Sequence, residues 1–201
     1  MLGGIALLVF AAVVIGVAIA GGGDGDGIEA DPFEIGFAEA VGSPLPPFDR
    51  TLTGVGSVAP DIRTHTTLSD EQVFFEMADG TVRLVEFFVH SCPHCQREVT
   101  AQSEWLAANE VPDGVEILTI STGVNSGAPN YPPSVWFKRE EWPLPVYVDS
   151  QFGAIATGYG MTSFPYYVLV DGDGIVVERS SGEMTAEEFS ALIGRAAALS
   201  G

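Results

Sequence analysis

The chain contains two cysteines, Cys92 and Cys95, separated by Pro93 and His94. A secreted protein held by structural disulfides normally carries an even set of cysteines spread along its length. A single C-x-x-C pair therefore indicates redox chemistry or metal binding. It stands where an apolar, strand-like run gives way to a helical pattern, and Pro93 suits the first helical turn. The helix dipole and the unpaired N–H groups there favour a thiolate, which is the nucleophilic form of cysteine.

Each residue of the motif has a predicted role. Cys92, at the helix start, is the expected attacking group that forms a mixed disulfide with a partner. Cys95, one turn later, attacks that mixed disulfide and releases the partner. His94 can donate a hydrogen bond or positive charge to the Cys92 thiolate, which would make the disulfide more oxidising. The redox-active disulfide is then the working group, and no other cofactor is expected.

Zinc binding is the structural alternative for this pair. His65 or His90 could supply further ligands. Structural zinc usually takes four ligands, commonly from two paired knuckles, and the second cysteine pair is missing here. An inert buried pair is disfavoured further, because Pro93 and the helix start keep Cys92 near the surface. The redox interpretation is therefore preferred.

The elements that must position the pair form an α/β pattern. Residues 81–90 are apolar enough to be a central strand buried on both faces, and Asp171-Gly172-Asp173-Gly174 is typical of a hairpin turn. Thr185 and Glu188 fit a capping box at the start of the last helix. The predicted strands are 61–66, 81–90, 115–121, 146–149, 165–170 and 175–179, and the predicted helices are 93–109, 134–142, 151–159 and 185–199.

Residues 1–23 carry no charged side chain and are long enough to cross a bilayer as a helix. A cleaved signal peptide is the alternative, since Ala18-Ile19-Ala20 fits a small-x-small cleavage site. The apolar run is longer than a usual signal-peptide core and has no basic leader, which favours a retained anchor. We expect a single-pass membrane protein whose catalytic domain faces the extracytoplasmic side. The predicted domains are the anchor, 1–23, an acidic Gly/Pro-rich tether, 24–58, and a folded domain, 59–201.

The chain is strongly acidic, with 27 Asp and Glu against 8 Lys and Arg and a formal net charge of −19. Such a surface repels phosphate backbones, so no nucleic-acid partner is expected. Net charge reports solubility rather than fold, and a solvated acidic surface is preferred over a dedicated basic partner.

The runs LVEFFVHSCPHCQRE and GYGMTSFPYYVLVDGDGIVV resemble the thioredoxin superfamily. They are most similar to its TlpA/ResA-like branch, whose members are anchored in bacterial envelopes. The resemblance covers about residues 59–199, and the PLPPF…GSVAPDI lead-in is also similar. It implies a thioredoxin fold, in which helices flank a central mixed sheet, and the activity of a thiol–disulfide oxidoreductase.

The resemblance also implies roles for residues outside the motif. Pro165 occupies the place of the family's cis-proline, which lies against the C-x-x-C and helps to dock substrate; Phe164 departs from the usual Thr or Val. Glu86 falls where the family keeps a buried acid that shuttles protons to the second cysteine. A solvent-facing acid is the alternative, but its apolar neighbours favour burial. Glu98 matches a glutamate of the ResA-like group, with an ordinary exposed helix acid as an equal alternative. Ser91 replaces the usual tryptophan.

The direction of electron flow stays open in this resemblance. Cys-Pro-His-Cys is associated with DsbA-type oxidases, whereas the surrounding residues are similar to reductases. The preferred hypothesis is reduction of protein disulfides in the cell envelope, fed by an upstream thiol electron donor; disulfide donation is the alternative. A peroxiredoxin-type peroxidase is disfavoured because Val89 stands where such enzymes usually have threonine. A metal-binding module using Cys92, Cys95 and a histidine is a third class of function.

Overall fold

The computed structural model describes residues 27–201, whose centre is a five-stranded mixed sheet in the order β6-β5-β4-β7-β8. β4 (Val82–Phe88), β5 (Val115–Ser121) and β6 (Val146–Val148) run parallel to one another. β7 (Tyr166–Val170) and β8 (Val176–Ser181) are antiparallel to their neighbours. All seven residues of β4 are buried, as expected for an apolar central strand. The predicted thioredoxin-like α/β fold is confirmed.

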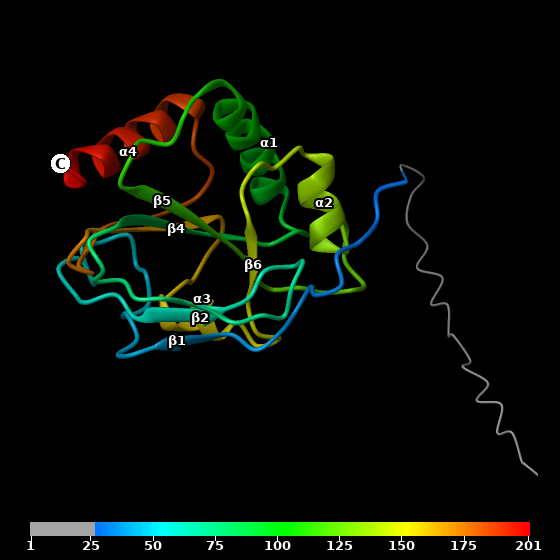
Figure 1. Ribbon diagram of the computed structural model, residues 1–201, viewed down its shortest axis with the longest axis horizontal. Coiled ribbons are helices and arrows are strands. Elements are labelled where there is room, and N and C mark those ends of the chain that lie inside the picture. Colours follow the sequence, from blue (N-terminus) through cyan, green and yellow to red (C-terminus); the bar gives the residue numbers. More distant parts are fainter. Residues whose placement is uncertain (1–26) are drawn as a thin grey trace, which may run out of the picture.

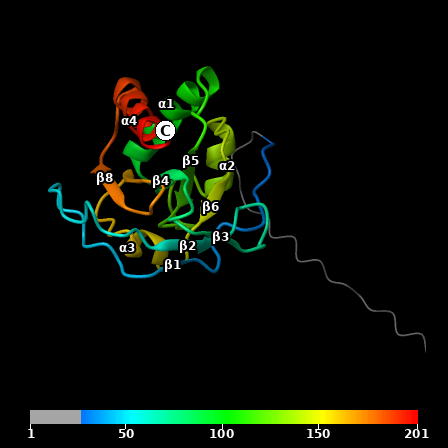
Figure 2. The same ribbon diagram turned by 60° about the vertical axis from the view of Figure 1, so that its left-hand side comes forward.

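Three helices cover one face of this sheet, which we call the helix face (Figures 1 and 2). They are α1 (Pro93–Ala108), α2 (Pro133–Arg139) and α4 (Ala186–Leu199). The predicted capping box at Thr185 and Glu188 is present at the start of α4. These helices place their apolar side chains against the sheet, and the end of α1 nearest the sheet carries the cysteine motif.

A small antiparallel sheet and one short helix cover the opposite side, which we call the small-sheet face (Figure 2). The sheet consists of β1 (Glu39–Val41), β2 (Asp61–Thr64) and β3 (Val73–Phe75), and the helix is α3 (Ala154–Gly158). Only β2 among these strands was expected from the sequence. β1 and β3 have three residues each, which is too short for a period-two pattern to be recognised.

The side chains of β4 alternate between two hydrophobic cores. Val85 and Phe87 belong to the core on the small-sheet face, whereas Leu84 and Phe88 belong to the core on the helix face. Because successive side chains of a strand point to opposite faces, Glu86 points to the helix face, between Leu84 and Phe88. This alternation brings a carboxyl group under α1.

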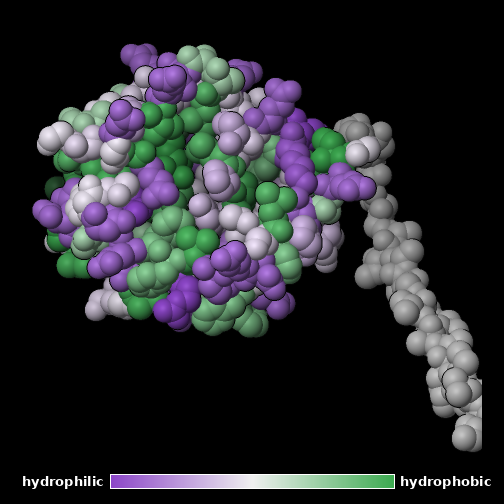
Figure 3. Space-filling view, in the orientation of Figure 1, coloured by the Kyte–Doolittle hydropathy of each residue, from purple (hydrophilic) through white to green (hydrophobic). Residues whose placement is uncertain are grey.

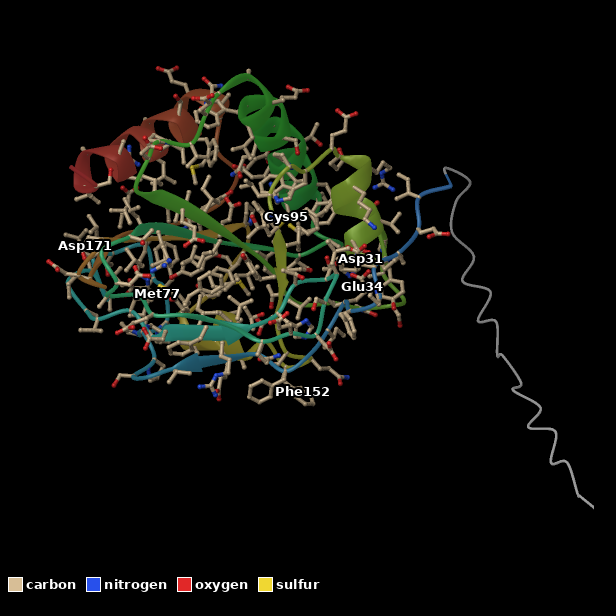
Figure 4. The ribbon with its side chains drawn as sticks, viewed as in Figure 1. Asp31, Glu34, Met77, Cys95, Phe152 and Asp171 are labelled. Carbon is tan, nitrogen blue, oxygen red and sulfur yellow. The ribbon has the colours of Figure 1, made fainter. Side chains whose placement is uncertain are left out.

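The segment predicted as a tether packs against the domain along much of its described length. Leu45 and Phe48 are buried in the core of the small-sheet face. Figure 4 shows Asp31 and Glu34 beside α2, where Glu34 accepts a hydrogen bond from the backbone N–H of Ser134 at 3.1 Å. An extended, proline-spaced chain can insert isolated apolar side chains into a core without any helix or strand period, so the sequence pattern does not reveal this packing.

Residues 27–201 include no helix that is both long and apolar enough to cross a membrane. The predicted anchor, residues 1–23, lies outside the described residues. Hydrophilic residues cover much of the face shown in Figure 3, with hydrophobic groups gathered between them.

Candidate active site

The cysteine motif lies at the junction of β4 and α1. A turn closed by a hydrogen bond from the Cys92 N–H to the Val89 carbonyl, at 2.9 Å, separates the two elements. Cys92 is the N-cap of α1 with extended backbone angles, φ −83° and ψ 120°, and Pro93 occupies the first helical turn. The predicted helix start is therefore confirmed, and the sulfur of Cys92 is attached where the N-terminal end of the helix favours negative charge.

The two thiols have different surroundings, although three positions separate them. Cys92 is 7% exposed, whereas Cys95 is fully buried at the base of α1, where Figure 4 shows it against the sheet. Both are free thiols in this structure. The backbone N–H of Val89 donates to the Cys95 sulfur at 3.4 Å. Burial nevertheless raises the pKa of Cys95 far above that of an ordinary thiol. Ionisation of Cys95 thus needs a nearby base.

Glu86 is fully buried on the helix face. The Thr119 hydroxyl donates to its Oε1 at 2.9 Å, and its Oε2 has no hydrogen-bond partner among residues 27–201. Burial raises the pKa of Glu86 to about 8, with a further contribution from the charge of Glu98. The predicted burial is confirmed, and the carboxyl group can take up or release a proton near neutral pH.

Glu98 is also buried, which resolves the two alternatives left by the sequence. It is 1% exposed, and its Oε2 accepts a hydrogen bond from the Met184 N–H at 2.6 Å. Gln102, one turn further along α1, donates to its Oε1 at 2.9 Å. Burial raises the pKa of Glu98 above its usual range, and these hydrogen bonds work in the opposite direction. The helix face therefore buries two carboxyl groups whose charges act on each other, and the charge of Glu98 acts on Cys95 as well.

His94 contacts a carboxylate in the structure. Its Nδ1 lies 3.0 Å from Oε2 of Glu183, in the connection between β8 and α4. Arg97 donates two hydrogen bonds to the same carboxylate, at 2.8 and 2.7 Å. These hydrogen bonds, first that of Arg97, lower the pKa of Glu183 to about 2. Glu183 is thus an acidic partner that competes for His94, and the interaction of His94 with Cys92 stays a prediction.

Pro165 lies at the edge of the sheet that carries the motif. The Phe164–Pro165 peptide bond is cis, as the resemblance implies. β7 runs antiparallel to β4 with Tyr166 opposite Phe87, so the start of β7 lies beside the end of β4. Phe164 is 41% exposed next to this proline, where a docking partner could contact it. A second cis bond, before Pro132, was not expected from the sequence.

The histidines considered as zinc ligands have other partners. His90 is buried; its Nδ1 lies 2.7 Å from the Pro129 carbonyl, and its Nε2 accepts the N–H of Asn125 at 3.1 Å. His65 is buried too, with Nδ1 2.9 Å from the Thr66 carbonyl. Within residues 27–201, no three His, Cys, Asp or Glu side chains are grouped so that they could hold a metal ion.

Several residues of the site were missed by sequence reasoning. Gln102 shares the buried stripe of α1 with Cys95 and Glu98, at helical spacing, and this periodicity could have identified it. Tyr167 is the cross-strand partner of Glu86, which requires the strand register to be known. Glu183 is 89 residues from His94, and no local pattern connects the two.

Comparisons with known proteins agree with this geometry. Residues 54–193 match the Redoxin family. The thiol-disulfide oxidoreductase ResA of Geobacillus thermodenitrificans is 30% identical over 144 residues, which cover 70% of this chain and 77% of that protein. ResA of Bacillus cereus is 26% identical over 141 residues, or 70% of this chain and 78% of the relative.

Solved structures show the same fold at lower sequence identity. A protein assigned as the thiol:disulfide interchange protein DsbE, from Chlorobium tepidum, has a TM-score of 0.59 at 20% identity, over 73% of this chain and 98% of the other. StoA from Bacillus subtilis has a TM-score of 0.53 at 19% identity, over 69% of this chain and 97% of StoA. The family match, the ResA relatives and the cysteine pair at the helix start lead to one conclusion. The chain belongs to the Redoxin family and is a thiol–disulfide oxidoreductase of the TlpA/ResA-like branch of the thioredoxin superfamily.

Proposed function

We propose that this protein reduces disulfides of proteins in the cell envelope, through its Cys-Pro-His-Cys motif and without a further cofactor. Residues 1–23 would anchor it in the membrane, with the catalytic domain on the extracytoplasmic side. The observation that carries the proposal is the asymmetry of the two thiols: Cys92 is the N-cap of a helix and keeps 7% of its surface exposed, whereas Cys95 is fully buried on the face that also buries Glu86 and Glu98.

In the proposed reaction, the Cys92 thiolate attacks a disulfide of the partner protein. One sulfur of the partner leaves as a thiolate, and the other forms a mixed disulfide with Cys92. Cys95 then gives its proton to the Glu86 carboxylate and attacks the Cys92 sulfur. The mixed disulfide breaks, the Cys92–Cys95 disulfide forms, and the partner leaves with both cysteines reduced. An upstream thiol donor returns the two electrons.

One feature favours reduction over disulfide donation. Nδ1 of His94 faces Glu183, whose carboxylate offsets positive charge that would otherwise stabilise the Cys92 thiolate. Arg97, which shares Glu183, works in the opposite direction, so disulfide donation is the second candidate function.

The reduction potential of the Cys92–Cys95 pair tests this direction. Equilibration with dithiothreitol or glutathione should give a potential below about −230 mV, since thioredoxin lies near −270 mV and the oxidase DsbA near −120 mV. The potentials of thioredoxin and DsbA differ by about 150 mV, which is roughly 7 kcal/mol for two electrons at about 1.4 kcal/mol per 30 mV. A potential above about −150 mV would show that the protein donates disulfides instead.

Measurement of hydrogen peroxide turnover distinguishes a reductase of protein disulfides from a peroxiredoxin-type peroxidase, which the family match alone does not do. We expect no turnover above the rate of free thiols, because Val89 replaces the threonine expected of a peroxiredoxin. Catalytic consumption of peroxide by the purified full-length protein would refute the proposed function in favour of a peroxidase.

A further inference from the structure

Tyr167 occupies a central place on the helix face. It is 1% exposed and stands directly opposite Glu86 in the antiparallel pair of β4 and β7. Directly opposite residues of such a pair point to the same face, so both side chains project under α1. Its neighbour Tyr166 points the other way, into the core of the small-sheet face. The hydroxyl group of Tyr167 is thus placed between two elements that each carry a buried acid.

Tyr167 stands opposite the first acid, Glu86, and contacts the side chain that binds the second, Glu98. Its hydroxyl lies 3.4 Å from Nε2 of Gln102, which also donates to Oε1 of Glu98. The nearby Tyr167 hydroxyl lowers the pKa of Glu98 and so favours its carboxylate form. Burial raises the pKa of Tyr167 well above its usual range, and the charges of Glu98 and Glu86 raise it further. The hydroxyl therefore remains protonated and acts as a donor.

We propose that Tyr167 couples Glu86 on β4 and Glu98 on α1 into one buried acid pair that holds a single proton, and that loss of this proton lets Glu86 accept the proton of Cys95. This inference rests on the proposed function and assigns Tyr167 as a positioning residue. Two negative charges in one poorly solvated region repel each other, so the pair retains one proton when the other is lost. The Tyr167 hydroxyl stabilises the charge on Glu98, which leaves the proton on Glu86.

The ionisable groups around this pair come from several elements, and one of them, Glu183, opposes the charge on Glu98. Glu86 comes from β4, Tyr167 from β7, and Cys95 and Glu98 from α1, with Cys92 at the start of the helix. Glu183, from the connection before α4, adds a negative charge that raises the pKa of Glu98. No cation is among the groups that shift the pKa of Glu86, Glu98 or Tyr167 within the described part of the chain.

The coupling controls when Cys95 can react. Cys95 loses its proton to Glu86 as its sulfur attacks the mixed disulfide at Cys92; one S–S bond breaks as another forms, and the partner sulfur leaves with the electron pair. The step requires Glu86 as a carboxylate, so its rate should rise with pH through about 8. Without the Tyr167 hydroxyl, Glu98 is protonated more readily and raises the pKa of Glu86 less. The rate should then rise at a lower pH.

The test uses the full-length reduced protein and a chromogenic aromatic disulfide, dithionitrobenzoate. Attack by Cys92 releases one coloured thiolate, and attack by Cys95 releases the second, so the two steps appear as separate phases. The pH midpoint of the second phase is compared in wild type, Tyr167→Phe, Glu98→Gln and the double variant. We expect Tyr167→Phe to lower the midpoint by about half a pH unit, as expected when a neighbouring charge is weakened. Glu98→Gln should lower it at least as far, and the double variant should match Glu98→Gln alone.

Tyr166→Phe is the matched control, because it also removes one buried hydroxyl but on the opposite face. It should leave the midpoint of the second phase unchanged. The inference is overturned if Tyr167→Phe leaves the midpoint in place, or if its shift adds in full to that of Glu98→Gln. Failure of the proposed function looks different: the wild-type protein itself would then show no second phase.

Discussion

The two faces of the central sheet bury polar groups in different ways. On the small-sheet face, Arg179 donates to the Tyr166 hydroxyl at 2.7 Å and to the carbonyls of Thr53 and Pro46 at 2.7 and 2.8 Å. On the helix face lie all the buried side-chain atoms that lack a hydrogen-bond partner among residues 27–201: Glu86 Oε2, Gln102 Oε1, Ser103 Oγ, Trp136 Nε1 and Trp142 Nε1.

This difference indicates that one face of the sheet contributes mainly to stability and the other to the reaction. An unpaired buried polar group costs about 1–3 kcal/mol, so a protein selected for stability alone would pair it or replace it. Glu86 and Gln102 lie on the same face as Cys95, the thiol that has to lose a proton from a buried position, and Gln102 binds Glu98, whose charge acts on Cys95. The small-sheet face therefore supports the fold with satisfied polar groups, and the helix face retains unsatisfied ones, of which Glu86 and Gln102 belong to the candidate site.

The largest expected effect is on activity, at the cysteines of the helix face. Cys92→Ala should lower the rate of insulin disulfide reduction by roughly 10³-fold or more, because the attacking thiolate is lost. Cys95→Ala should instead trap mixed disulfides with partner proteins, visible on non-reducing gels. Equal residual activity in the two variants would contradict the roles assigned to the two thiols.

The largest effect on stability should come from the small-sheet face. Arg179→Ala removes the donors of five hydrogen-bond acceptors, including the Tyr159 carbonyl at 3.1 Å, and should lower the free energy of unfolding by about 2–4 kcal/mol. Denaturant unfolding measures this loss.

Arg195→Ala is the matched control for Arg179→Ala. Arg195 pairs with Glu178 at 2.8 Å on the surface, where an ion pair contributes about 0–1 kcal/mol. If both substitutions cost the same free energy of unfolding, the contrast between the two faces is wrong.

Glu86→Gln should slow chemistry while stabilising the fold at high pH. The rate of the Cys95 step should fall by roughly 10²-fold, the contribution of a positioned base. Because the pKa of Glu86 is raised from 4.5 to about 8, folding favours its protonated form. Its stabilising contribution is complete below the unfolded pKa and is lost as pH rises through about 8, by several kcal/mol at most.

Unfolding measured between pH 4 and pH 9, a range of about 5 pH units that spans the pKa of Glu86 in both states, checks this prediction. Wild type should lose stability over that range, and Glu86→Gln should lose less of it. Glu104→Gln, an exposed acid on α1, is the control and should keep the wild-type slope. Parallel slopes for all three proteins would show that Glu86 carries no proton in the folded state.

Much of the fold could be predicted because its elements carry local patterns. The apolar run of β4, the proline at the start of α1 and the hairpin turn before β8 each determine an element by themselves. The packing of Leu45 and Phe48 could not be predicted in the same way, since both are single apolar residues in an irregular segment. Their burial depends on the surface that the rest of the chain forms.

Some residues of the candidate site could likewise be predicted from local sequence patterns, and others could not. Cys92, Cys95 and Pro165 stand in a recognisable motif, and the apolar neighbours of Glu86 indicate its burial. The contact between His94 and Glu183 depends on how the β8–α4 connection crosses α1, which no short-range pattern records. Sequence reasoning therefore identified the reacting groups, whereas the groups that tune them required the tertiary structure.

The smallest expected effect concerns this tuning at the surface. Glu183→Gln removes the carboxylate shared by His94 and Arg97 and leaves their positive charge near Cys92, which favours the thiolate form of the reduced protein. The reduction potential should become more oxidising by less than about 30 mV, and high salt should diminish the shift because exposed charges are screened. Glu187→Gln, another exposed glutamate, should leave the potential unchanged. A shift toward a more reducing potential would show that Glu183 acts on the thiols by a route other than its ion pairs with His94 and Arg97.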